Sequence, residues 1–530
     1  MMHIRTRINA RARRVGGFLT AVVGLAILTA LTTMAAVAAA EAPVAEAVKH
    51  RDVAAVHALL RQGADPNVSQ ADGATALHWA AYWNDRDVVA SLIQAGADID
   101  VVNDLGVTPL WLASTHQDAS VASGLLSRGA NPNIVHVSGE SPLMAAARTG
   151  RVKTVRELLA HGARVDAADT EHDQTALMWA AANRHAEVIR ALIESGADVH
   201  ARSRTRMRKV YLPSRGASYR LSFEEHIASG DIEEREHGGF SPLLFVAQQG
   251  DAESAQLLLD AGADVNDTAP IGWSALAVAA FLNQTAVAHV LLDAGAELDV
   301  GEAGFTALHA AVLRGDGALV KSLLAHGANP NVEITRATGA RRQSGDYGFS
   351  ANMVGATPLY LAARYGEVAI MEALAAAGAD LKFVMPEGTT PMMAAVQVDR
   401  INSLNLENAG NGGLGRDRRD RHVYFRLTDT PSPEAVEHDI LEMVTLAVSG
   451  GDEVNAVDAA GNTPLHHAAR NGLNRVVDFL VGYGANLDAR NDRRETPAEA
   501  AEAPRRNRGG DLYDGHLETA ALLRRLAARR

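Results

Sequence analysis

The sequence predicts an all-α solenoid of about twelve helix-turn-helix units, with hairpin loops between the units and three insertions. Three observations lead to this fold class. A short motif that starts with Thr or Ser recurs along most of the 530 residues. Its copies lie at a nearly constant spacing. Each copy begins two apolar segments with helical periodicity, and a Gly-containing turn follows them.

The motif starts at eleven positions: Thr75, Thr108, Ser141, Thr175, Ser241, Ser274, Thr306, Thr357, Thr390, Thr463 and Thr496. Most of the intervals between them are 32, 33 or 34 residues, and the exceptions, 66, 51 and 73 residues, each equal one period plus an insertion. One further unit, which lacks the motif, precedes them from Val44. A unit this small cannot fold alone, so neighbouring units must bury one another's apolar faces.

Each part of the unit has a mechanical reason. The hydroxyl of Thr108 can cap a helix, and Pro109 then occupies the first helical position, where no N–H is needed. Leu110 is expected in the core. Gly150 ends a first helix, because a left-handed residue is favoured there. The stretch Gly63–Asn67, "GADPN", ends a second helix and starts a turn.

The combined pattern, "TPLHxAA…G…VxxLLxxGADxN", resembles the ankyrin repeat from about residue 44 to 526. This resemblance implies helix pairs joined by hairpin loops, and a concave face that binds other proteins. The sequence departs from the pattern in places. Asn84, Arg184 and Asn283 stand where the family usually has Gly, and the last unit breaks after one turn and resumes near residue 515.

The domain boundaries follow from this register. Repeats are expected at residues 41–202, 240–334, 355–397 and 434–530, and insertions at 203–239, 335–354 and 398–433. The third insertion contains four closely spaced arginines, Arg416, Arg418, Arg419 and Arg421, and the Gly-rich run "GNGGLG". Long insertions in a compact array are either disordered or functional. They provide extra contact surface, or they fold back onto the protein itself, and the sequence leaves both open.

Residues 1–40 form a basic, an apolar and a small-residue segment in turn, which predicts a secretory signal peptide. The alternative is an uncleaved membrane anchor over residues 15–37, which are long enough to span a bilayer. In both cases we expect an exported protein of the periplasm or cell envelope, with membrane contact only if the segment is retained.

The composition excludes several kinds of chemistry. The chain has no cysteine, which excludes disulfides, thiolate metal sites and a cysteine nucleophile. Its net charge of −13 argues against a nucleic-acid partner. His78, His309 and His466 occupy the TxLH position, where the resemblance implies local hydrogen bonds. No P-loop, zinc-protease or nucleophile-elbow motif occurs. We therefore expect no catalytic, cofactor-binding or metal-binding residues, and no cofactor.

The favoured function is a non-catalytic, monomeric scaffold for protein–protein interaction, with a partner that the sequence does not identify. Alternatives are an accessory or chaperone-like factor that binds a small molecule, metal or cofactor through the inserted loops, and an unrecognised hydrolase. The resemblance implies that two positions before the first helix's closing glycine face solvent on the concave side. The partner-binding residues predicted there are Tyr82, Trp83, His116, Arg148, Asn183, Phe281, Leu282, Arg314, Arg364 and Tyr365. Trp83, Phe281 and Tyr365 are the expected anchors. A neighbouring set, Trp79, Trp179 and Phe245, is expected in the core.

Overall fold

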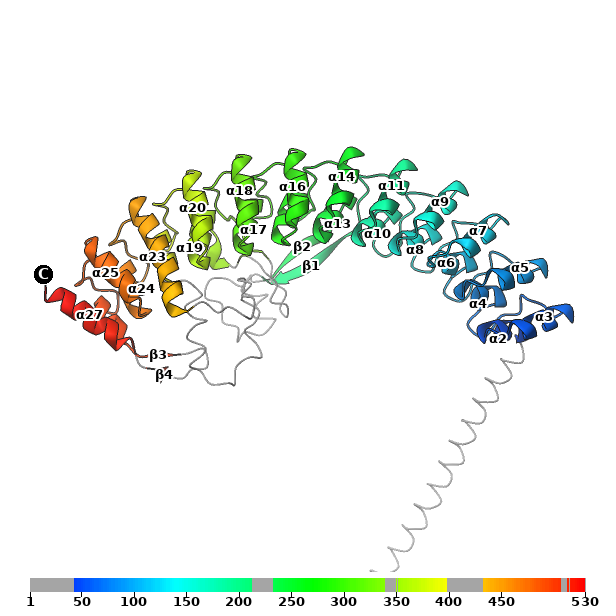
Figure 1. Cartoon of the computed structure of the whole chain (residues 1–530), viewed down its shortest axis with the longest axis horizontal. Coiled ribbons are helices and arrows are strands. Elements are labelled where there is room, and N and C mark those ends of the chain that lie inside the picture. Colours follow the sequence, from blue (N-terminus) through cyan, green and yellow to red (C-terminus); the bar gives the residue numbers. More distant parts are fainter. Residues whose placement is uncertain are drawn as a thin grey trace, which may run out of the picture. The chain divides into compact units, whose positions relative to one another are not determined.

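The computed structural model describes residues 42–211, 232–338, 349, 351–397, 432–506, 512–513 and 515–529 (Figure 1). The chain divides into two compact units, Met1–Ser203 (unit 1) and Arg204–Arg530 (unit 2). The predicted signal peptide and most of the third insertion, including its arginines and Gly-rich run, lie outside the described residues. Within the described stretches, no helix has the length and apolar character needed to cross a membrane.

Unit 1 contains five helix pairs, each an inner and an outer helix (Figure 1). Each inner helix packs on the next inner helix, and each outer helix on the next outer helix. The inner helices are α2 (Pro43–Lys49), α4 (Ala76–Tyr82), α6 (Pro109–Ala113), α8 (Pro142–Arg148) and α10 (Ala176–Ala182). The outer helices are α3 (Val53–Arg61), α5 (Arg86–Gln94), α7 (Ser120–Leu126), α9 (Val152–Ala160) and α11 (Ala186–Glu194).

Unit 2 repeats the arrangement with seven helix pairs. Its inner helices are α13 (Pro242–Gln249), α15 (Ala275–Phe281), α17 (Ala307–Arg314), α19 (Pro358–Tyr365), α21 (Pro391–Val396), α24 (Pro464–Arg470) and α26 (Pro497–Glu502). Its outer helices are α14 (Ala252–Asp260), α16 (Thr285–Asp293), α18 (Gly317–Ala325), α20 (Val368–Ala376), α23 (Pro433–Ser449), α25 (Asn474–Gly482) and α27 (Leu517–Ala527). The described residues therefore hold twelve pairs, which confirms the predicted helical solenoid.

The inner helices begin and end as the motif predicts. The Thr108 hydroxyl accepts a hydrogen bond from the Trp111 N–H at 3.1 Å, and Pro109 follows at the first helical position. At the other end, Gly250 is left-handed, with φ of 78°. The three residues that replace this Gly keep the same backbone conformation, since φ is 54° at Asn84, and 60° at both Arg184 and Asn283. A left-handed conformation at a non-Gly residue stores some strain.

Buried histidines connect successive repeats. In His78, Nδ1 accepts the Thr75 N–H at 3.1 Å, so Nε2 carries the proton and donates to the Val107 carbonyl at 2.9 Å. His309 and His466 bond their own Thr in the same way. Burial lowers the pKa of His78, and it lowers that of His309 to about 4. These contacts agree with the local role that the resemblance implied for the TxLH histidines.

A second connection uses the last residue of the "GADxN" turn. The Asn67 amide donates to the Gly96 carbonyl at 2.9 Å, and its Oδ1 accepts the Asp98 N–H at 2.7 Å. Asn133, Asn331 and Asn455 likewise donate to the corresponding carbonyl of the following unit. One side chain thereby satisfies a helix-end carbonyl and a loop N–H of its neighbour.

The insertions add structure that the sequence did not predict. Strands β1 (Thr205–Tyr211) and β2 (Ile232–Gly238) pair antiparallel, and a shorter pair, β3 (Arg505–Arg506) and β4 (Leu512–Tyr513), separates α26 from α27. The second insertion contributes a 3-10 turn, η1 (Ala351–Met353), and a fully buried ring, Phe349. The helices on either side of residues 398–431, α21 and α23, pack on each other.

Candidate functional site

The predicted anchors at the ends of the inner helices differ sharply in exposure. In unit 1, Tyr82 is 48 % exposed and Trp83 is 38 % exposed. In unit 2, Phe281 and Tyr365 are each only 7 % exposed. The expectation that Phe281 and Tyr365 face solvent is therefore wrong, whereas Tyr82 and Trp83 do reach the surface.

Rings and chain segments from outside α15 and α19 explain this burial. The Phe281 ring packs edge-on against Trp273, with ring centroids 4.9 Å apart, and it also contacts Phe305 at 5.6 Å. Phe349 of the second insertion contacts Phe305 in turn, with ring centroids 5.0 Å apart and the ring planes tilted by 44°. The Tyr365 hydroxyl reaches the sulfur of Met353, in the same insertion, at 3.4 Å. In unit 2, neighbouring rings thus cover Phe281 and the second insertion covers Tyr365, whereas Tyr82 and Trp83 are open in unit 1.

The other predicted residues are mostly tied to the chain itself. Arg148 forms an ion pair with Glu140 at 3.2 Å, and its guanidinium lies over the Trp179 ring. The Nε of Arg314 donates to the Phe281 carbonyl. Asn183 is exposed, and its amide donates to the Trp179 carbonyl at 2.7 Å. The remaining three, His116, Leu282 and Arg364, are half-buried.

Three rings in unit 1 form a cluster that we call the aromatic triad: Trp79, Tyr82 and Trp83. Tyr82 stands edge-on to both neighbours, with centroid distances of 5.9 Å to Trp79 and 4.9 Å to Trp83. The Trp79 indole N–H donates to the Gln70 side chain at 2.8 Å. The Arg51 guanidinium lies 5.4 Å from the centre of the Trp83 ring. These contacts hold the rings in place before any partner arrives.

The expectation that the aromatic residues in the middle of the inner helices belong to the core is wrong. Trp79, Trp179 and Phe245 are half-buried, not core residues. They lie four residues after the cap of the inner helix. The core is instead made by positions such as Leu77 and Leu177, which are fully buried.

A second surface in unit 1, the finger patch, was missed by sequence reasoning. It consists of four aliphatic side chains at the tips of two neighbouring hairpins: Val102 (48 % exposed), Leu105 (56 %), Val135 (41 %) and Val137 (67 %). The Val137 N–H donates to the Leu105 carbonyl at 3.0 Å, which joins the two tips. The sequence does contain an indication of this patch. Hairpin tips normally carry polar turn residues, whereas these two tips carry aliphatic ones.

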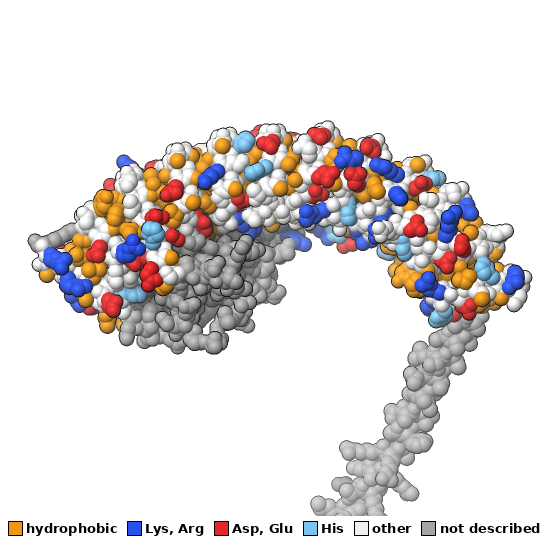
Figure 2. All heavy atoms as spheres, in the orientation of Figure 1, with side chains coloured by type: hydrophobic (Ala, Val, Ile, Leu, Met, Phe, Trp, Pro, Cys, Tyr) orange, Lys and Arg blue, Asp and Glu red, His pale blue; other side chains and the backbone are white. Residues whose placement is uncertain are grey.

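Charged side chains of both signs are mixed on the surface of each unit. Figure 2 shows cationic and anionic side chains interspersed over the visible face of each unit, with apolar side chains between them. That face therefore offers no uniformly basic surface of the kind that binds a nucleic-acid backbone.

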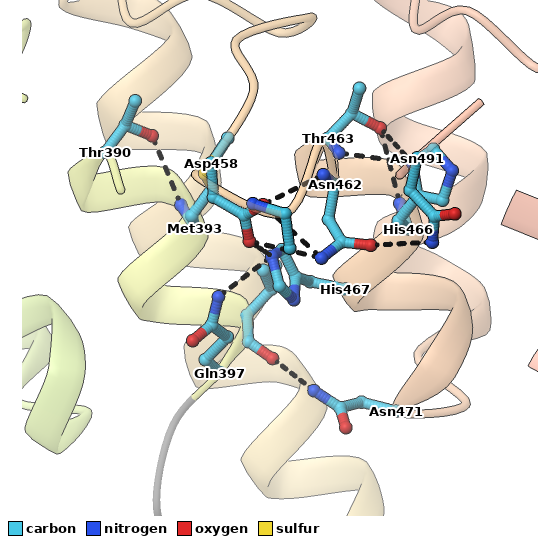
Figure 3. A network of polar contacts seen from close by, with 12 residues as sticks. Thr390, Met393, Gln397, Asp458, Asn462, Thr463, His466, His467, Asn471 and Asn491 are labelled. Atoms are coloured by element: carbon cyan, nitrogen blue, oxygen red, sulfur yellow. Dashed lines mark hydrogen bonds and ion pairs between the residues drawn. The ribbon is translucent and has the colours of Figure 1, made fainter. Parts of the chain in front are cut away.

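A polar cluster joins α21 to α24 in unit 2 (Figure 3). Nε2 of His467 lies 2.9 Å from Oδ2 of Asp458 and 3.0 Å from the terminal amide of Gln397. Asp458 also accepts the Asn462 N–H at 2.9 Å. Burial alone would raise the pKa of Asp458, but the hydrogen bonds from His467 and Asn462 outweigh it and hold the pKa below its ordinary value.

This arrangement resembles part of a catalytic triad, but among the described residues no hydroxyl is bonded to His467. The nearby Thr463 hydroxyl bonds His466, not His467. In the described part of the chain, no group of three His, Asp or Glu side chains could hold a metal ion. The cluster therefore joins a hairpin to two helices, and it fixes Gln397 at the point where the third insertion leaves α21.

Comparison with known proteins identifies the repeat. The family profile described as "Ankyrin repeats (3 copies)" matches residues 44–136, 118–203 and 227–334. A second, described as "Ankyrin repeat", matches residues 354–384 and 460–492. Together these matches cover more than half of the chain.

Curated relatives match over parts of their length. Human protein phosphatase 1 regulatory subunit 27 is 39 % identical over 107 residues, which is 19 % of this chain and 66 % of that protein. Human neurogenic locus notch homolog protein 1 is 34 % identical over 145 residues, 27 % of this chain and 5 % of that protein. The mouse B-cell lymphoma 3 protein homolog is 31 % identical over 220 residues, 41 % and 43 % of the two chains. The chain therefore spans less than two thirds of each of these relatives.

Proposed function

Because the chain belongs to the ankyrin-repeat family, we propose that it is a non-catalytic scaffold whose protein partner docks on unit 1, over the aromatic triad and the finger patch. Ankyrin repeats generally mediate protein–protein binding, and one relative is named as a regulatory subunit of a phosphatase. A repeat array needs no active site for such a role, because its binding surface is built from side chains that vary without disturbing the fold.

One observation carries the proposal. Two equivalent helix-end positions are open at Tyr82 and Trp83 and closed at Phe281 and Tyr365, respectively. Tyr, Trp and Arg are the residue types enriched at binding hot spots, and Trp83 combines a large exposed ring with Arg51 stacked on it. The finger patch adds exposed apolar area, and such patches on a soluble protein commonly mark a site of interaction with another protein.

The docking test uses the full chain as bait in an envelope extract, with quantitative mass spectrometry of the proteins that copurify. The test variant is Trp83→Ala, and the matched control is Tyr483→Ala, which removes an aromatic side chain that is 58 % exposed in unit 2. A protein retained by the parent and the control but lost by Trp83→Ala supports docking on the triad. With that protein purified, the loss should be about 2 kcal/mol or more. Equal retention by all three baits would refute it.

We further propose that this scaffold works outside the cytoplasm, as a monomer in the periplasm or cell envelope. The support is the basic, apolar and small-residue order of residues 1–40. Amino-terminal sequencing of the mature protein should give a start near Ala39 or Glu41. Recovery of the intact amino terminus in a soluble cytoplasmic fraction would contradict export.

A further inference from the structure

The β1–β2 ribbon has an unusual distribution of charge between its two faces. Side chains alternate between the faces along each strand, and directly opposed residues share a face. Arg206 opposes His237, and Arg208 opposes Arg235. One face of the ribbon, which we call the basic face, therefore carries three arginines and a histidine, with one acidic position, Glu233, opposite Val210 at its far end.

The opposite face, which we call the balanced face because it carries charges of both signs, has one lysine and two glutamates. There Met207 opposes Glu236, and Lys209 opposes Glu234, with 3.9 Å between the Lys209 ammonium and the Glu234 carboxylate. Like charges placed directly opposite destabilise a strand pair. The segregation of charge is therefore a cost to the ribbon's own stability, and it is unexpected in a chain with a net charge of −13.

The side chains of β1 are more exposed than those of β2. Arg206, Arg208 and Lys209 are all exposed, and Met207 is 61 % exposed. On the β2 side, Arg235 is half-buried and its guanidinium contacts the Ala337 carbonyl at 3.5 Å. In the described residues β1 pairs only with β2, so its other edge presents backbone groups to a further strand.

We propose that the edge of β1 binds an extended acidic segment of a protein partner, by strand addition, with its carboxylates over the basic face. Alternate residues of an added strand lie about 6.6 to 6.8 Å apart, which matches the spacing of Arg206 and Arg208 on β1. Arginine suits this role because its planar guanidinium pairs with a carboxylate through two parallel hydrogen bonds. Arg206, Arg235 and His237 also have contacts within the chain, and the bound segment adds to these or exchanges with them.

The geometry favours a peptide over other polyanions. Strand addition needs backbone N–H and C=O groups, which a peptide has and a nucleic acid or lipid headgroup lacks. A long polyanion would also meet Glu234 and Glu236 on the other face and the acidic surface of the remaining chain. This site lies in unit 2 and does not depend on the docking surface proposed for unit 1.

The test measures binding of a fluorescent peptide of alternating Glu and Thr to the full chain by anisotropy at low salt. Arg206→Gln with Arg208→Gln should weaken binding by roughly tenfold or more, since two charge pairs are lost. The control is Lys209→Gln, on the same strand but the balanced face, which should change affinity less than about twofold. A Glu-Thr peptide that is N-methylated at every residue keeps the charge but has no N–H to donate to the edge, and it should not bind.

Three outcomes would overturn the proposal. Equal binding of the N-methylated peptide would exclude strand addition, and equal losses for Lys209→Gln and Arg208→Gln would show that only net charge matters. Binding that appears only when residues 212–231 are replaced by a short turn would make the chain's own segment the occupant. Circular dichroism of each variant should match that of the parent, because the ribbon lies outside the helical array.

Discussion

Asp452 should make unit 2 less stable as the pH rises, which is the opposite of the usual behaviour of a carboxylate. Its side chain is 6 % exposed and accepts the Met392 N–H at 3.0 Å, so it caps the start of α21 from 60 residues away. Burial raises the pKa of Asp452 from 3.8 to about 6, although hydrogen bonds from Met392 and Thr390 oppose this rise. The cost of desolvating the charged carboxylate therefore exceeds the stabilisation that its hydrogen bonds provide.

The magnitude follows from the two pKa values. Between pH 3.8 and about 6 the folded chain keeps a proton on Asp452 that the unfolded chain has released. The free energy of unfolding therefore falls as the pH rises through this interval, by up to about 3 kcal/mol for a shift of about two pH units. Asp452→Asn has nearly the same shape, keeps an acceptor for Met392 and carries no charge. It should stabilise this region by that amount at pH 8 and by little at pH 4.

Hydrogen exchange of α21 and α23 provides a local readout, since each unit of an array opens partly on its own. Comparison of variant and parent at one pH cancels the intrinsic exchange rate. At pH 8 the exchange in Asp452→Asn should be slower by up to about a hundredfold. Asp458→Asn is the control of opposite sign, because the pKa of Asp458 is lowered and its contribution is present at neutral pH. Faster exchange in Asp452→Asn at pH 8 would refute the reasoning.

Three further predictions concern the fold. Gly106→Ala should cost more stability than Gly96→Ala, by about 1 kcal/mol or more in urea unfolding. Both glycines are left-handed, but only at Gly106 would the new Cβ meet a backbone, 3.2 Å from the Val135 carbonyl. Equal costs for the two substitutions would show that the two neighbouring hairpins can move apart without loss of stability. Phe349→Ala should lower the stability of unit 2 by about 3–5 kcal/mol, and an unchanged melting curve would mean that the second insertion is not part of the core. His309 should make unit 2 acid-sensitive, because its folded pKa of about 4 lies below its ordinary 6.5. The stability it contributes is present above pH 6.5 and is lost by up to about 3 kcal/mol as the pH falls toward 4, so His309→Gln should melt with a weaker pH dependence than the parent over this interval.

The repeat itself could be predicted because its determinants are local. The cap at Thr108 and the left-handed residue at Gly250 act within a few positions of the chain. Even the departures were recognisable, since Asn84 takes the conformation of the Gly that it replaces. The period then placed every helix pair without any knowledge of long-range contacts.

The surface could not be predicted in the same way, because its cover comes from outside the repeat. Phe281 is equivalent to Tyr82, and Tyr365 is equivalent to Trp83, and nothing within these inner helices distinguishes a buried ring from an exposed one. The difference arises from Trp273 on a hairpin and from the second insertion, which brings Phe349 to Phe305 and Met353 to Tyr365. The ribbon was hidden for another reason, since β1 is rich in arginine and has only weak strand propensity.

The bridging asparagines also bear on how an array of this kind gains and loses members. Asn67 takes both of its partners from the next unit, a Gly carbonyl and a loop N–H, and any unit that ends in the same turn supplies them. A duplicated stretch of one period would therefore carry a complete junction at each end. Asn331 makes the same pair of bonds with residues 47 and 49 positions later, across an insertion. A segment can accordingly be inserted between two units without changing the hydrogen bonds that join them. New loops can therefore arise in such a protein while the packing of the repeats is kept.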